Sequence, residues 1–266
     1  MDYVANEPTP RGPNQGGFTL VELLVVVAII GILLGLLLPA LSYARFRAKV
    51  TTCTNNYRQW GVAVNLYATE DGRGRLPTSP LPVRKMTGYS SLEPWFVPYG
   101  VVTNMARHGV TVPMWFCPLR PQRYNLHEEN FRILRGRELA SIDDMVDEFA
   151  NFQRSAFVFP DVFWWVPRNL GESSLEYPDP KLMKTRSPDP WPKTIDDPHG
   201  STQPFITDET WGQKDGNSWK PTQGHAWASV TRNSNSSFVD GHVETRPTAK
   251  LEWQVTSSLP DTVYMY

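Results

Sequence analysis

The sequence is poor in cysteine and close to neutral in charge. Its two cysteines, Cys53 and Cys117, are too few for a disulfide framework or for a zinc site. One bridge between them is an alternative if this part of the chain is exported, and two buried free thiols is the other. The formal net charge is −1, so the overall charge of the chain does not attract nucleic acid or an anionic surface.

Motifs of the common catalytic classes are also missing. The chain has no G-x-S-x-G, no H-E-x-x-H and no G-x-x-x-x-G-K-[ST]. Ser229 and Ser237 lie near His225 and Asp240 in sequence, which is weak support for a nucleophile and its base. We therefore expect a protein that is not an enzyme and that needs no cofactor.

One group of residues could hold a divalent metal. His225, Asp240, His242 and Glu244 supply two imidazoles and two carboxylates, and His242 and Glu244 share a face if they lie on a strand. The alternative is that Asp240-Gly241 is a turn and that His242 and Glu244 are the exposed face of a hairpin. Both interpretations stay open at this stage.

A long apolar run lies near the start of the chain. Leu23 to Ala44 carries no charge, and about 20 such residues span a bilayer. A secretory signal peptide has a shorter apolar core, of roughly 7–15 residues, and a small-residue cleavage site, which is not found here. The run therefore predicts a membrane-spanning helix.

The helical pattern continues beyond the apolar run. Apolar and small side chains recur every three or four residues, and Asp71 to Gly74 supplies a stop. The stripe that we predict to face the domain is Leu41, Ala44, Ala48, Thr52, Asn56, Trp60, Val64 and Tyr67. We expect one helix from near Phe18 to near Thr69, membrane-spanning to about 44 and amphipathic after that, with a kink at Pro39.

Gly17-Phe18-Thr19-Leu20-Val21-Glu22 resembles the processing motif of type IV prepilins and type II secretion pseudopilins. The resemblance implies cleavage between Gly17 and Phe18 by a membrane prepilin peptidase, N-methylation of Phe18 and removal of a leader, residues 1–17. Pro39 is then the twenty-second mature position, where pilins often have a kinking proline.

Glu22 falls at the fifth mature position. A carboxylate at bilayer depth costs on the order of 3 kcal/mol unless it is paired. The resemblance implies that it pairs with the terminal amine of a neighbouring subunit and so sets the register of assembly. The alternative is that Glu22 lies at the level of the lipid headgroups.

Later segments resemble prepilin-like proteins that are abundant in planctomycetes, whose function is poorly defined. The similar segments are Cys53–Gly61, Tyr67–Gly72, Trp115–Pro118 and Phe238–Glu244. That group usually has a His about ten residues before its Asp-Gly-His element, whereas His225 precedes Asp240 by fifteen.

The remaining residues, 73–266, predict an α+β domain in which an antiparallel sheet packs on the N-terminal helix. The resemblance implies that this domain is extracytoplasmic and pilin-like. Ser141 is expected to cap a helix whose apolar face is Ile142, Met145, Phe149 and Phe152. Residues 168–223 are rich in Pro, Ser, Asp and Gly and are interpreted as surface loops. The strand candidates are Val112–Phe116, Ala156–Phe159, Phe163–Val166, Pro204–Asp208, Ala226–Arg232, Ser236–Val239 and His242–Thr245.

The apolar run predicts a single membrane span, and the prepilin resemblance implies an inner-membrane location with a cytoplasmic leader and a periplasmic C-terminal domain. Arg45, Arg47 and Lys49 follow the apolar run and oppose this topology under the positive-inside rule. The expected partners are prepilin peptidase, other pilin or pseudopilin subunits and the inner membrane, and no nucleic acid.

The expected role is that of a structural subunit of a type IV pilus-like or type II secretion fibre. The alternative is a membrane-tethered binding protein that uses the signal for export only. Its candidate sugar-stacking residues are Trp164, Trp165, Trp191, Trp211, Trp219 and Trp227, and their burial would count against it.

Overall fold

The structure is a computed structural model, and it describes residues 18–79, 94–155, 157–169, 176–177, 191–216, 218–256 and 262–266. The chain divides into two compact units, Met1–Arg45 and Phe46–Tyr266. The first helix, α1 (Leu20–Glu70, 51 residues), contributes to both units. Its bounds agree with the helix predicted from near Phe18 to near Thr69, and Pro39 lies within it without ending it.

The second half of α1 supplies one wall of the core of the C-terminal unit. Its buried residues are Phe46, Val50, Cys53, Tyr57, Trp60, Gly61, Ala63, Val64 and Ala68. Trp60 and Val64 were predicted on this face, but Thr52 and Asn56 are not buried. The predicted stripe was rotated by one position there, because Cys53 and Tyr57 carry more apolar surface than Thr52 and Asn56 do.

Two antiparallel sheets form the C-terminal half of this unit. The strands of the first are β3 (Val162–Trp164), β6 (Ile206–Asp208), β9 (His225–Trp227), β10 (Val230–Ser237) and β11 (Val243–Pro247). Their order is β11-β10-β6-β3, with β9 also paired to β10. The strands of the second are β7 (Thr210–Asp215), β8 (Ser218–Gln223), β12 (Trp253–Thr256) and β13 (Thr262–Met265), in the order β12-β13-β7-β8.

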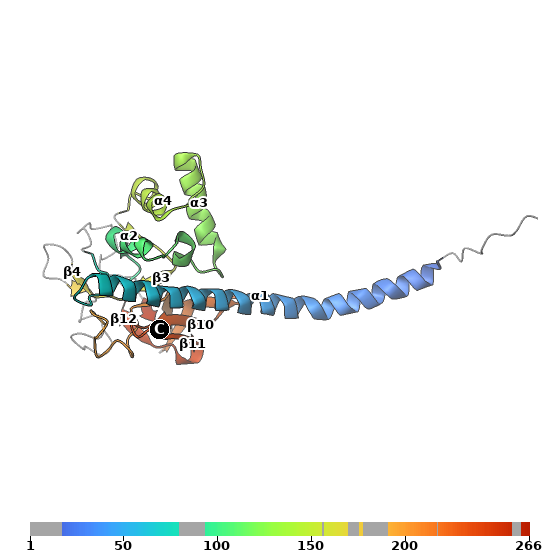
Figure 1. The fold of residues 1–266 in the computed structure, drawn as a ribbon. Coiled ribbons are helices and arrows are strands. Elements are labelled where there is room, and N and C mark those ends of the chain that lie inside the picture. The colour runs from blue at the N-terminus through green and yellow to red at the C-terminus, as the bar shows by residue number, and fades with distance from the viewer. Residues whose placement is uncertain are drawn as a thin grey trace, which may run out of the picture. The chain divides into compact units, whose positions relative to one another are not determined.

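Short helices cover the opposite side of α1. Figure 1 shows α2, α3 and α4 above the helix and β10, β11 and β12 below it. The helical elements are α2 (Tyr99–Arg107), η1 (Val112–Trp115), α3 (Pro121–Arg135), α4 (Ile142–Asp147), η2 (Glu148–Phe152) and η4 (Thr248–Lys250). Two small ladders complete the described elements, β1 (Val97–Pro98) with β2 (Phe157–Val158) and β4 (Arg168–Asn169) with β5 (Glu176–Tyr177). The predicted α+β class, with a helix packed on antiparallel strands, is confirmed.

Aromatic side chains fill the space between these layers. Trp60 of α1 is fully buried, and its ring meets Trp115 edge to face at 4.4 Å and lies 5.8 Å from Trp164. A second cluster lies between the two sheets and consists of Phe163, Trp165, Trp191, Trp211, Val255, Tyr264 and Tyr266. Burial of this aromatic surface stabilises the unit.

Two local predictions are confirmed. Ser141 caps α4, because its Oγ accepts a hydrogen bond from the N–H of Asp144 at 3.1 Å. Asp240-Gly241 lies in the connection between β10 and β11, which pair in antiparallel register, and Gly241 has φ +89°. Only a residue without a side chain adopts that conformation without strain.

Three local predictions are wrong. Val112–Phe116 is not a strand, because Pro113 near the start of the segment favours the 3₁₀ turn η1. The predicted strand Pro204–Asp208 contains β6, but the rest of the stretch 168–223, interpreted as loops, also contains β4, β5, β7 and β8. That interpretation rested on the Pro, Ser, Asp and Gly content of the stretch, but β8 is an edge strand, where the missing N–H of Pro221 is tolerated. Phe152 is 40% exposed rather than part of the apolar face of α4.

Candidate functional site

The first turn of α1 is closed by Thr19 and Glu22. Oε2 of Glu22 accepts the backbone N–H of Thr19 at 2.8 Å and its hydroxyl at 2.7 Å. In return, the N–H of Glu22 donates to Oγ1 of Thr19 at 3.2 Å. This reciprocal arrangement is a capping box, and it satisfies donors that a helix start otherwise leaves free. Gly17 lies outside the described residues, and Phe18 directly precedes the cap with its ring exposed.

The apolar run that follows is exposed along its whole length. No charged residue occurs between Glu22 and Arg45, and Leu, Val and Ile side chains throughout the run face outward. By length and composition α1 can cross a membrane, and none of its most apolar window is buried within the chain. Such a surface is stable only against lipid or against other apolar helices.

Comparison with known proteins identifies this segment. Residues 12–38 match the family described as "Prokaryotic N-terminal methylation motif". The chain carries a prepilin-type N-terminus. A stretch of 58 residues is 36% identical to "Type II secretion system core protein G" of Pseudomonas aeruginosa PAO1, and it covers 22% of this chain. The chain spans 41% of that relative's length, and no solved structure matches the chain.

Outside the prepilin-type segment, the four predicted metal ligands do not form one group. His225 lies on β9 opposite Asn233 of β10, whereas Asp240 follows the far end of β10. At about 3.3 Å per residue, the four steps from Asn233 to Ser237 alone cover roughly 13 Å. The predicted set was therefore wrong as a single site, because sequence proximity to the hairpin does not bring His225 to it.

The remaining three predicted ligands lie at the surface. Nδ1 of His242 is 2.6 Å from Oδ1 of Asp240, and Nε2 of His242 is 4.0 Å from Oε1 of Glu244. His242 also stacks on Phe238, with ring centroids 4.1 Å apart. These contacts hold the connection between β10 and β11 in shape and agree with the alternative interpretation, an exposed face of a hairpin.

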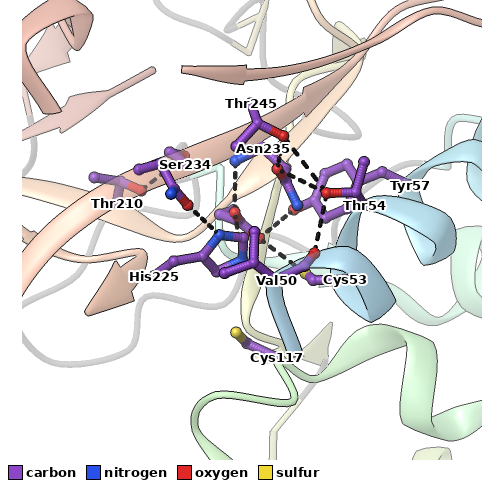
Figure 2. A network of polar contacts seen from close by, with 12 residues as sticks. Val50, Cys53, Thr54, Tyr57, Cys117, Thr210, His225, Ser234, Asn235 and Thr245 are labelled. Atoms are coloured by element: carbon purple, nitrogen blue, oxygen red, sulfur yellow. Dashed lines mark hydrogen bonds and ion pairs between the residues drawn. The ribbon is translucent and has the colours of Figure 1, made fainter. Parts of the chain in front are cut away.

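His225 belongs instead to a buried centre that the sequence did not reveal (Figure 2). Its ring is fully buried beside the thiols of Cys53 and Cys117 and the carboxylate of Asp208. The structure has both cysteines as free thiols. Cys53, Cys117 and His225 were each noted in the sequence, but Asp208 was missed, and nothing in their spacing indicated that the four converge.

The ionisation of this centre is strongly perturbed. The pKa of Cys117 lies well below its ordinary value, because the neighbouring Cys53 thiol and the His225 ring favour its thiolate form more than burial disfavours it. The pKa of Cys53 is raised well above its ordinary value, because its thiol interacts with the Cys117 sulfur, is buried and lies beside the Asp208 carboxylate, to which it donates at 3.6 Å. Burial alone would lower the pKa of His225, but the adjacent Asp208 carboxylate and Cys117 sulfur raise it to about 9.

The tryptophans proposed to bind sugars are mostly internal. Trp164, Trp165, Trp191 and Trp211 are buried, and Trp219 and Trp227 are partly buried. Trp165 stacks on Trp191 at 5.0 Å, and the Trp191 indole N–H donates to the hydroxyl of Tyr266. Rings with these internal partners are not available for stacking on a ligand.

Proposed function

We propose that this protein is a structural, non-catalytic subunit of a type IV pilus-like or type II secretion fibre. The observation that carries the proposal is a prepilin-type motif, residues 12–38, that leads into an exposed and uncharged helix. The similarity to a type II secretion core protein over 58 residues supports the same role. Prepilin peptidase cleaves between Gly17 and Phe18 and methylates the new amine of Phe18.

Three segments carry out this function. Residues 1–17 are the cytoplasmic leader, residues 18–72 form the helix and residues 73–266 form the periplasmic domain. Before assembly, the apolar half of α1 anchors the subunit in the inner membrane. Arg45, Arg47 and Lys49 then lie on the periplasmic side. Anionic lipid headgroups and neighbouring subunits can pair with their positive charges there.

Glu22 has two roles in this account. Its Oε2 closes the first turn of α1 through Thr19, a role that needs no neighbour. Its negative charge, which costs on the order of 3 kcal/mol in lipid when unpaired, is relieved by the methylated amine of an adjacent subunit. Because that amine reaches Glu22 only at one axial offset, the pair sets the register, and Pro39 adjusts the packing of the helices beyond it.

Two substitutions of Glu22 separate the roles. Glu22→Gln keeps an oxygen that accepts the N–H of Thr19 and loses the charge, and Glu22→Ala loses both. The proposal predicts that both variants are cleaved and that both are absent from sheared fibres. Glu70→Gln removes a carboxylate from the other end of the same helix and should be incorporated like the wild type.

Normal incorporation of both Glu22 variants would overturn the register role. If the wild-type chain is never found in a fibre fraction, the protein is instead a tethered binding protein that uses the motif for export. The buried tryptophans count against sugar as its ligand.

A further inference from the structure

Three soft ligand atoms converge in the core of the C-terminal unit. Cys53 of α1, Cys117 after η1 and His225 of β9 each offer one atom, and these atoms all lie within 4.8 Å of one another. All three side chains are buried. Figure 2 shows that they approach from three separate elements around a common centre.

A hydrogen bond at Nδ1 fixes the orientation of the His225 ring relative to the two sulfurs. Nδ1 lies 2.7 Å from the amide oxygen of Asn233, an acceptor, so Nδ1 carries a proton and donates it. Nε2 is buried and has no hydrogen-bond partner among the described residues, although Oδ2 of Asp208 lies 3.1 Å away. A metal-binding histidine is commonly fixed in this way, with one nitrogen hydrogen-bonded to an oxygen and the other free for the metal.

Asp208 adds a fixed carboxylate to the same centre. Its Oδ1 accepts the Tyr57 hydroxyl at 3.0 Å and lies 3.6 Å from the Cys53 sulfur, and its Oδ2 accepts the N–H of Asn235 at 2.6 Å. Asp208 is 1% exposed. A carboxylate and two ionisable thiols around one histidine are costly to bury unless a cation balances them.

We propose that Cys53, Cys117 and His225 bind a zinc ion, with Asp208 completing the coordination. Two sulfurs, one imidazole nitrogen and one carboxylate oxygen form a ligand set that zinc takes in tetrahedral geometry, whereas calcium and magnesium require oxygen ligands. Zinc–ligand bonds of 2.0–2.3 Å place ligand atoms about 3.5–3.8 Å apart. The three atoms therefore need to close by about 1.3 Å at most from separations within 4.8 Å.

Zinc binding needs no oxidant, reductant or other reagent. The ion takes the place of the protons on Nε2 of His225 and on the thiols, and these protons pass to solvent. Cys117 also lines a groove of about 380 Å³, together with Thr52, Asn56 and Tyr124, among others, and this groove is the side from which the ion would enter. The bound ion would link α1 to the segment after η1 through Cys117 and to β9 through His225.

A disulfide between Cys53 and Cys117 is the competing use of the two sulfurs. It would require an external oxidant to remove two electrons and two protons, and it would leave Nε2 of His225 facing only the Asp208 carboxylate, at 3.1 Å. Zinc accounts for all three side chains, whereas a disulfide accounts for two. The inference is independent of fibre assembly, because the centre lies wholly in the C-terminal unit.

The test uses the full-length chain, purified from membranes in mild detergent without chelator. Elemental analysis and native mass spectrometry should find one zinc per chain, and the reduced, stripped protein should regain one zinc with a higher melting temperature. Replacement by Co²⁺ should produce thiolate-to-cobalt charge-transfer absorption, a readout that needs no variant. Cys117→Ser and His225→Ala should each lose the metal, and His242→Ala, at the exposed turn, should keep it.

Two results would overturn the proposal. One is a chain whose cysteines resist alkylation until reduced and that takes up no zinc after reduction. The other is a His225→Ala variant that takes up zinc or cobalt as the wild type does and whose circular dichroism spectrum matches that of the wild type.

Discussion

The carboxylate of Glu22 accepts the backbone N–H of Thr19 at 2.8 Å. The residue that places a charge in the apolar run is therefore also the residue that closes the helix in front of it. A capping residue contributes about 1 kcal/mol to a helix start. Loss of Glu22 changes both the charge and the cap, so a second substitution is needed to assign an effect to one of them.

Thr19→Ala supplies that second substitution. It removes the hydroxyl to which the N–H of Glu22 donates and leaves the carboxylate in place. A loss of about 1 kcal/mol should make amide hydrogen exchange in the first turn of α1 about fivefold faster. Thr19→Ser keeps the hydroxyl and should exchange at the wild-type rate. Equal rates in Thr19→Ala and the wild type would show that the side-chain contact contributes nothing.

Trp60→Ala should be among the most destabilising substitutions in the C-terminal unit. Its fully buried ring packs between Trp115 and Trp164, and its removal leaves a cavity that costs about 3–5 kcal/mol. Val62→Ala, two residues along the same helix, alters a side chain that is 60% exposed and should cost less than about 0.5 kcal/mol. Denaturant unfolding of both variants in detergent measures the difference, and similar midpoints would contradict the packing described here.

Asp144 should make stability dependent on pH in the acid range. Arg137 donates to its carboxylate, and the N–H groups of Ala140 and Ser141 add two more hydrogen bonds, so the pKa of Asp144 lies well below its ordinary value. A carboxyl with a lowered pKa stabilises the fold above its unfolded pKa of about 3.9, and this contribution is lost as the pH falls through the folded value.

Asp144→Asn should therefore be less stable than the wild type at pH 7, and the gap between them should narrow below about pH 4. Denaturant unfolding at a series of pH values measures the gap. Asp143→Asn changes the exposed neighbouring carboxylate and serves as the control. A gap for Asp144→Asn that stays constant with pH would show that its charge contributes nothing.

Two glycines should respond to alanine with opposite signs. Gly241 has φ +89°, so Gly241→Ala strains the backbone and should cost about 1–2 kcal/mol. Gly61 lies within α1, and an added Cβ would meet its nearest neighbour, Oγ of Ser237, at an ordinary 3.5 Å. Gly61→Ala should therefore stabilise the fold by about 0.5–1 kcal/mol. Unfolding midpoints that shift in the same direction would contradict one of the two local geometries.

Local signals in the sequence predicted local structure well. The uncharged run after Glu22 predicted α1, Ser141 predicted the cap of α4, and Asp240-Gly241 predicted the connection between β10 and β11. Each of these depends on residues within a few positions of one another, where propensity and capping chemistry decide the outcome. β8 was missed because Pro221 is tolerated only by virtue of the strand's edge position, which the sequence does not encode locally.

The buried centre could not be predicted for a related reason. Cys53, Cys117, Asp208 and His225 come from four separate segments, and they meet only because β6, β9 and the segment after η1 all pack against α1. The small number of cysteines argued against zinc only while they were considered without His225 and Asp208. The helix register also mattered, since the predicted stripe had Thr52, and not Cys53, facing the core.

The most direct test of the proposed function is the N-terminus of the protein in its native membrane. Intact mass and peptide mass spectrometry should find a chain that begins at N-methylated Phe18 and lacks residues 1–17. That result would also place Arg45, Arg47 and Lys49 on the periplasmic side, because cleavage occurs at the cytoplasmic face. An intact chain that still begins at Met1 would contradict the account and leave α1 as a membrane anchor alone.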